Sequence, residues 1–286
     1  PDVVLDDLAE VASAVAADAG LELSGIEGIG VGAPGPMDFE RGLILNAPNL
    51  PGWENVALRD RLAEATGRPV TMENDANAAA FGEFWAGAGG SDQITHMVMY
   101  TLGTGIGTGL VIDNRIIRGA FGVGGEGGHT IVNPDGPLCG CGQRGCLEVY
   151  AAASRVAEHA VNRIKAGADS SLAERIENGD DIGAEDVFAA AADGDEVSET
   201  VIEQATTHLG IACVNICRLL DPQMIVFAGG MIAAGDALFG RIRTAYDKHH
   251  WTMTESHVEI VPAQLGNHAG VIGAAGVAWQ ERSETS

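Results

Sequence analysis

One histidine and three cysteines lie within eighteen residues of this chain, and no other feature constrains its fold as strongly. The block runs from His129 through Cys139 and Cys141 to Cys146, with nine, one and four intervening residues. Three thiolates and one imidazole can close a tetrahedral zinc site, and the intervening glycines let the backbone bend tightly. Four protein ligands leave no open coordination position, so we predict a structural zinc that stiffens a loop. The alternative is cysteines that cluster by chance or pair as disulfides, although Cys139 and Cys141 are too close for an easy bridge.

The segment from Val70 onward predicts a short buried strand, a polar turn and an alanine-rich helix. Asn or Asp at such a junction is first of all an N-cap. However, four of the five residues in Glu73–Asn77 are polar, which is more than one cap requires. A carboxylate at the carboxyl end of a strand, beside a helix start, lies where open α/β sheets bind ligands. Asp75 is therefore a candidate functional residue.

A third segment, Tyr100–Gly109, alternates glycine with threonine between two apolar runs. This pattern predicts a hairpin whose backbone amides can approach an anion closely. It is not a Walker A loop, because the Gly-Lys-Ser/Thr ending is absent, and it does not open a helix. Taken alone, the segment fits an ordinary tight hairpin equally well.

These segments together resemble the ROK family of sugar kinases and sugar-responsive repressors, and the glucokinase-like group in particular. The resemblance extends over about residues 28–279. The motifs that carry it are Glu73–Asn77, Gly103–Gly109, the block from Glu126 to Glu148, Gly32–Pro36, Asn46–Trp53, Ala228–Gly230 and Leu265–Asn267.

Mixed alternation of strands and helices predicts an α/β chain with two ribonuclease-H-like lobes around a cleft. The resemblance implies an actin/hexokinase-type ATPase fold with a zinc-binding loop. It also implies that residues 1–73 form a small lobe completed by a helix at 267–286. Residues 74–266 would then form the large lobe, which holds the zinc loop.

The resemblance implies a role for each matched residue. Asp75 would be the catalytic base that accepts the proton of the attacking sugar hydroxyl. The groups that would hold a hexose are Asn49, Asn74, Asp75, Glu126, His129 and Glu148. The groups that would hold ATP are Gly103, Thr104, Gly105, Gly229 and Gly230, with Mg²⁺ to neutralise charge. If one nitrogen of His129 binds zinc, the other is fixed as a donor to the sugar.

The family's Asp-x-Gly-Gly-Thr phosphate loop has no counterpart here. The simplest expectation is that it lies upstream of Pro1, and the alternative is a genuinely shortened, inactive protein. Three functions stay open. The first is an ATP-dependent hexose kinase acting at a primary hydroxyl, with glucose preferred over mannose or N-acetylmannosamine. The second is a sugar-responsive repressor, which would need a helix-turn-helix before Pro1. The third is an inactive sugar-binding protein.

The net charge argues against some classes of binding partner. The chain has 16 basic and 40 acidic residues, a net charge of −24, which would repel nucleic acid and acidic membranes. A high-salt habitat and ordinary acidic drift both fit this charge.

No run of eighteen apolar residues is present, and thiolate zinc ligands suit a reducing compartment, so we expect a cytoplasmic protein. Cys213 and Cys217 lie on an apolar helix and fit core packing. The resemblance implies a homo-oligomer, a dimer or tetramer.

Overall fold

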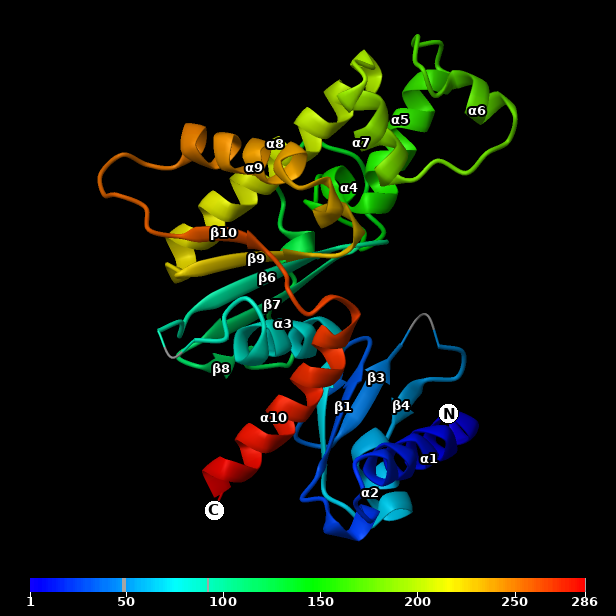
Figure 1. Ribbon diagram of the computed structural model, residues 1–286, viewed down its shortest axis with the longest axis vertical. Coiled ribbons are helices and arrows are strands. Elements are labelled where there is room, and N and C mark those ends of the chain that lie inside the picture. Colours follow the sequence, from blue (N-terminus) through cyan, green and yellow to red (C-terminus); the bar gives the residue numbers. More distant parts are fainter. Residues whose placement is uncertain (48–49, 92, 286) are drawn as a thin grey trace.

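The computed structural model describes residues 1–47, 50–91 and 93–285. Figure 1 shows one group of elements around a five-stranded sheet and a second group around two smaller sheets. The last helix, α10 (Ala269–Thr285), runs beside the second group, close to β1 (Ile29–Ala33). The amino- and carboxyl-terminal parts of the chain therefore meet in space.

The second group is built from residues near the amino terminus. Strand β1 pairs in parallel with β5 (Val70–Asn74), in the register Ile29↔Val70 to Ala33↔Asn74. The antiparallel strands are β2 (Met37–Asp38), β3 (Leu43–Asn46) and β4 (Glu54–Val56). The helices are α1 (Asp2–Asp18), the 3-10 turn η1 (Leu23–Gly25) and α2 (Leu58–Thr66). Their shared core contains Leu5, Val31, Met37, Ile44, Trp53, Leu58, Leu62 and Met72.

The large sheet has the strand order β10-β9-β6-β7-β8. Its strands are β6 (Met97–Leu102), β7 (Ile106–Ile112), β8 (Arg115–Ile116), β9 (Met224–Ala228) and β10 (Glu259–Pro262). Strands β6 and β7 form the predicted antiparallel hairpin, while β6 pairs with β9, and β9 with β10, in parallel. The central strands are buried on both faces, which explains their continuous apolar sequence.

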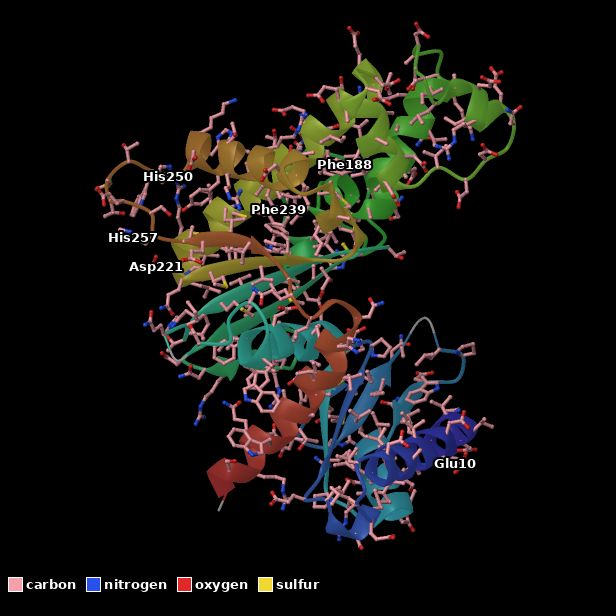
Figure 2. The ribbon with its side chains drawn as sticks, viewed as in Figure 1. Glu10, Phe188, Asp221, Phe239, His250 and His257 are labelled. Atoms are coloured by element: carbon pink, nitrogen blue, oxygen red, sulfur yellow. The ribbon has the colours of Figure 1, made fainter. Side chains whose placement is uncertain are left out.

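Helices cover both faces of this sheet (Figure 1). Met97 and Met99 pack with Ala80 of α3 (Asp75–Ala86) on one face. Tyr100 and Phe227 stack on the other face, at 5.6 Å between ring centroids. Figure 2 shows Phe239 between α9 and the sheet. The helices and 3-10 turns of this covering layer are α5 (Ala153–Lys165), α7 (Ala184–Ala192), α8 (Glu196–Leu220), η3 (Gly230–Ala234) and α9 (Asp236–His249). The short helix α6 (Ala173–Glu177) lies at the outer end of the layer, away from the sheet (Figure 1).

Residues 148–165 form two helices rather than one. Ala152 adopts extended backbone, with φ −64° and ψ 146°, and separates α4 (Glu148–Ala151) from α5. The break turns the start of α5 toward the glycine hairpin. There the Ser154 hydroxyl donates to the Thr104 carbonyl at 2.6 Å.

Helix α10 packs backbone to backbone against α3 and β1, directly after the turn η4 (Gly266–His268). A Cβ at Gly273 would lie 1.6 Å from the Ala78 carbonyl oxygen, and one at Gly30 would lie 1.9 Å from the Ala274 carbonyl oxygen. Both positions therefore require glycine. No helix in the described ranges is long and apolar enough to cross a membrane.

Candidate active site and zinc knot

At the junction between β5 and α3, one residue caps the helix and the next residue carries the candidate functional carboxylate. Asn74 is the N-cap, because its side-chain oxygen accepts from the amides of Ala76 at 3.0 Å and Asn77 at 3.2 Å. Asp75 is the first residue of the helix and is exposed. Its carboxylate accepts a bond only from the adjacent Ala76 amide, at 2.8 Å, among the bonds given for described residues. The cap therefore leaves the Asp75 carboxylate available to a ligand.

Asp75 lines a cavity of about 150 Å³ that opens to solvent. Residues from both groups of elements form its wall. The lining residues are Gly35, Pro36, Met37, Phe39, Asn74, Asp75, Ala76, Asn77, Gly107, Thr108, Gly122, Val123, Gly124, Gly125 and Glu126. The cavity therefore brings together three of the predicted sugar-side residues, Asn74, Asp75 and Glu126. Carboxylate and amide groups of this kind can accept and donate to a polyol.

The glycine hairpin is held in place by one hydrogen bond of its own and by one carboxylate outside it. The Gly103 amide donates to the Gly105 carbonyl at 3.0 Å and closes the turn. The Glu148 carboxylate accepts from the Ile106 amide at 3.0 Å. A Cβ at Gly105 would lie 2.4 Å from that carboxylate, so a larger residue there would push the Glu148 side chain aside. Hairpin geometry therefore depends on Glu148.

The two glycines after β9 differ in their surroundings. Gly229 has a positive φ of 96°, and a Cβ there would lie 2.3 Å from the Leu102 carbonyl oxygen. Gly230 faces open space, since no atom lies within 4 Å of its ideal Cβ position. The first glycine thus joins β9 closely to the end of β6, and the second leaves room for a ligand.

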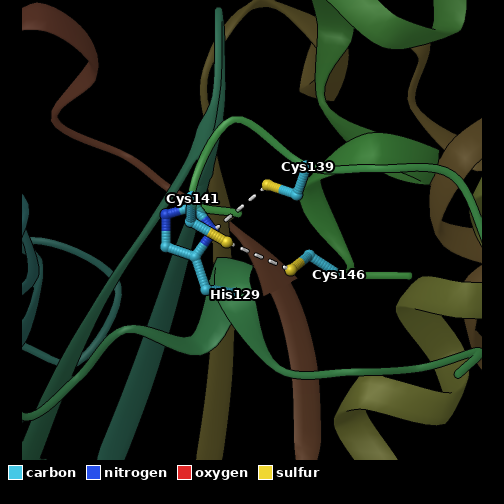
Figure 3. A group of neighbouring side chains, drawn as sticks. All are labelled: His129, Cys139, Cys141 and Cys146. Carbon is cyan, nitrogen blue, oxygen red and sulfur yellow. Dashed lines mark hydrogen bonds between the residues drawn. The ribbon is translucent and has the colours of Figure 1, made fainter. Parts of the chain in front are cut away.

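The side chains of His129, Cys139, Cys141 and Cys146 converge on one centre (Figure 3), and this four-residue cluster is the predicted zinc knot. Their ligand atoms all lie within 4.8 Å of one another. The Cys139 sulfur lies 3.6 Å from His129 Nδ1, and the sulfurs of Cys141 and Cys146 are 3.6 Å apart. Sulfurs on one tetrahedral zinc lie about 3.8 Å apart, so the four groups fit zinc after a small contraction. No disulfide forms among these cysteines, all of which are free.

The environment of the sulfurs is uneven. Hydrogen bonds, chiefly from the backbone of Gln143, lower the pKa of the Cys141 thiol to about 7. Burial raises the pKa of Cys146 to about 12 and raises that of Cys139 as well. A bound cation is the charge that would hold all three as thiolates at neutral pH. Because Nδ1 of His129 faces the sulfurs, Nε2 is left free of the knot.

His129 and Glu148 are not among the residues that line the cavity. His129 belongs to the 3-10 turn η2 (Gly127–His129), and its amide donates to the Glu126 carbonyl at 3.0 Å. Glu148 opens α4, with one oxygen 3.7 Å from the Cys139 sulfur. Asn49, the remaining predicted sugar-side residue, lies outside the described residues.

Two buried polar residues of the cavity wall were not among the predicted site residues. Asn77 is 5% exposed and its side-chain amide donates to Glu73 at 3.0 Å. Thr108 is also 5% exposed, and its hydroxyl has no hydrogen-bond partner among the described residues. Asn77 could have been inferred from its position one turn after Asn74 on the helix. Thr108 alternates with glycines and gives no such signal.

The fold and this site define a class of protein, the actin/hexokinase-type ATPases. A family model described as the ROK family matches residues 5–281. The chain belongs to the ROK family, which confirms the predicted fold class.

Relatives and solved structures agree with this assignment. The glucokinase of Halalkalibacterium halodurans is 39% identical over 91% of this chain and 78% of its own length. A crystal structure of a ROK hexokinase from Thermus thermophilus has a TM-score of 0.83 and 35% identity, covering 99% of this chain and 88% of that one. A ROK family glucokinase from Streptomyces griseus, in complex with glucose and AMPPNP, has a TM-score of 0.73 and 34% identity, covering 95% and 88%. A xylose repressor from Caldicellulosiruptor bescii is 32% identical over 87% of this chain and 61% of its own length.

Proposed function

We propose that this protein is an ATP-dependent hexose kinase that phosphorylates a primary hydroxyl, with glucose as its preferred sugar and glucose 6-phosphate as its product. The sugar-kinase class follows from glucokinase relatives at 35–39% identity. Glucose is favoured by their names and by the glucose-bound Streptomyces griseus structure. The observation that carries the proposal is the exposed Asp75 carboxylate, which lines the cavity while Asn74 caps the helix.

The reaction follows from this arrangement. The primary hydroxyl oxygen of the sugar attacks the γ-phosphorus of ATP while the bond to the β–γ bridging oxygen breaks. Asp75 accepts the hydroxyl proton, and ADP leaves. A carboxylate is a weak base toward an alcohol. It still suffices in a loose transition state, where the proton moves late and positioning dominates.

The sugar would be held by hydrogen bonds from several elements, because each hydroxyl loses water on entry. The Asn74 side-chain oxygen is occupied by helix capping, so its NH₂ group is left to donate. Glu126 accepts from the far side of the cavity, and Asn49 remains part of the proposal. His129 Nε2 and Glu148 would contact the sugar after modest closure of the cavity. Zinc on Nδ1 would keep Nε2 protonated and its ring fixed.

On the nucleotide side, we assign the amides of Thr104 and Gly105 to the phosphates, with Gly103, whose amide closes the turn, shaping the loop. Gly229 and Gly230 would approach the nucleotide. The AMPPNP-bound Streptomyces griseus structure supports ATP as the donor. A net charge of −24 gives no general attraction for ATP. Mg²⁺ bound to the phosphates, together with backbone N–H groups, would supply the positive potential.

We retain the other expectations within this proposal. Residues 1–73 with the helix at 267–286 would form the small lobe, and residues 74–266 the large lobe. We expect a cytoplasmic homo-oligomer without a nucleic-acid partner. The repressor alternative is less favoured, because the xylose repressor is less similar and 61% of its length is covered, against 78% for the glucokinase. An inactive sugar-binding protein would not need an available Asp75.

The test is an assay of ADP release with glucose, mannose and N-acetylmannosamine, combined with identification of the phosphorylated carbon by ³¹P–¹H NMR. We expect Mg²⁺-dependent turnover with the highest kcat/KM for glucose and a phosphate on its carbon 6. Specific binding of a sugar without any ADP release would contradict the kinase and favour the repressor or the inactive binding protein.

A further inference from the structure

Arg118 joins four separate parts of the molecule beside the cavity. Its Nε donates to Glu73 at 2.7 Å, and its Nη2 donates to Glu281 of α10 at 2.8 Å. Its guanidinium lies over the ring of Phe39, at 4.7 Å from the centroid. Arg118 itself follows β8, so one side chain contacts β5, α10 and the segment between β2 and β3. Phe39 is part of the cavity wall.

Glu73, the carboxylate partner of Arg118, lies on β5, two residues before Asp75. It is 1% exposed, and one oxygen accepts from the Asn74 amide at 2.9 Å and from the Asn77 side chain at 3.0 Å. The other oxygen accepts from Arg118. Both oxygens are thus used, and one of them fixes the backbone at the residue before Asp75. Both amide partners, Asn74 and Asn77, line the cavity.

Glu73 is the buried partner of this pair, whereas the Arg118 side chain is 29% exposed. Removing Arg118 would leave the buried Glu73 carboxylate without its charged partner, which is unfavourable. Lysine cannot replace Arg118, because the planar fork of arginine donates to two carboxylates and stacks on an aromatic ring at once. A pair needed only for stability would not have to lie between the cavity wall and the backbone of the proposed base.

We propose that Glu73 and Arg118 are positioning residues for phosphoryl transfer. Glu73 holds the Asn74–Asp75 turn so that the Asp75 carboxylate meets the sugar hydroxyl in line with the phosphate. Arg118 makes that orientation depend on the correct placement of Phe39 and α10, and thereby couples the base to the assembled cavity. This inference rests on the role of Asp75 in the proposed function.

The test compares Arg118→Lys and Glu73→Gln with the wild type in steady-state turnover and in glucose binding by calorimetry. We expect kcat to fall about tenfold to hundredfold, as small misplacements of a reacting group do. The Kd for glucose should be nearly unchanged, because neither Glu73 nor Arg118 lines the cavity that would hold the sugar. A purely structural pair would lower the melting temperature and leave the kcat of the folded enzyme intact.

Arg241→Lys is the matched control. Arg241 also forms a two-bond pair with a carboxylate, Glu199, and its side chain is 30% exposed against 29% for Arg118. It lies on α9, away from the cavity, so its kcat should equal that of the wild type. If Arg118→Lys does not fold, the uncharged pair Glu73→Gln with Arg118→Gln removes the buried charge and should still show the loss of kcat.

Asp75→Asn, assayed in parallel, separates the two claims. Wild-type kcat in Arg118→Lys and Glu73→Gln, together with an inactive Asp75→Asn, would overturn the positioning role alone. Wild-type kcat in Asp75→Asn would overturn the proposed base and the positioning role with it.

Discussion

The Glu148 carboxylate lies between the Ile106 amide, which donates to it at 3.0 Å, and the Cys139 sulfur, 3.7 Å away. The Glu148 side chain thus lies between the glycine hairpin and the zinc knot. These two segments were separate motifs in the sequence. A metal bound by Cys139 would therefore lie close to the carboxylate that accepts from the end of the hairpin that we assign to phosphate binding.

The zinc knot predicts a metal content of one zinc per chain. Elemental analysis of the purified, untagged protein should give a ratio near one, and Cys146→Ser should lower it strongly, because thiolates bind zinc and a serine hydroxyl does not. Cys217→Ser is the control, since Cys217 lies on α8 outside the knot and should keep the full zinc content. A wild-type protein without stoichiometric zinc would rule out the knot as a zinc site.

Gly105→Ala should uncouple the hairpin from Glu148. The new Cβ would lie 2.4 Å from the carboxylate, which must then move away from the Ile106 amide. We expect kcat/KM for ATP to fall by about tenfold or more, as loss of a positioned hydrogen-bond donor does. Gly240→Ala on α9 is the control: its Cβ meets nothing within 4 Å, so activity should be unchanged. Normal ATP kinetics in Gly105→Ala would remove the hairpin from the phosphate site.

Asp195 predicts a pH dependence of folding stability. This N-cap of α8 is 8% exposed and accepts from the amides of Ser198 at 2.8 Å and Ser171 at 2.6 Å. Burial alone would raise its pKa, but the hydrogen bonds outweigh burial and hold the pKa well below its usual 3.8. The folded state therefore binds this proton more weakly than the unfolded state. The resulting stability is complete above about pH 4 and is lost as the pH falls further.

Urea unfolding at several pH values measures this contribution. Asp195→Asn should lower the free energy of unfolding by about 1–3 kcal/mol at pH 7, because the amide cannot accept all of these bonds. The difference from the wild type should shrink as the pH falls below about 4. Asp193→Asn, an exposed neighbour, should match the wild type at every pH. A deficit in Asp195→Asn that is independent of pH would contradict the ionic origin.

Local signals in the sequence were enough for much of the fold. Helix α2 ends at Thr66, where Gly67 adopts a positive φ of 65°, as glycine readily does after a helix. The hairpin β6–β7 follows directly from glycines between apolar runs. The break at Ala152 has no signal in the sequence, because alanine favours helix and is not a stop residue.

The site was predictable only where neighbours in the sequence are also neighbours in space. The zinc knot fulfils that condition, since its four side chains all come from residues 129–146. The pairing of Glu73 with Arg118 does not, because 45 residues separate the two partners. Whether Asn74 or Asp75 caps α3 was equally undecidable, since both residue types cap well.

Asp75→Asn tests the central claim, that the exposed residue after the cap is the base of a hexose kinase. The change keeps the size of the side chain and removes the proton acceptor, so kcat should fall by about 10² or more while the Kd for glucose is largely kept. Asp236→Asn is the matched control, because Asp236 is likewise an exposed first residue of a helix, α9.

The decisive measurement is kcat for glucose phosphorylation in these two variants and the wild type, with glucose binding measured on the same samples. The account predicts loss of turnover in Asp75→Asn alone, with glucose still bound. Near wild-type turnover in Asp75→Asn would contradict it.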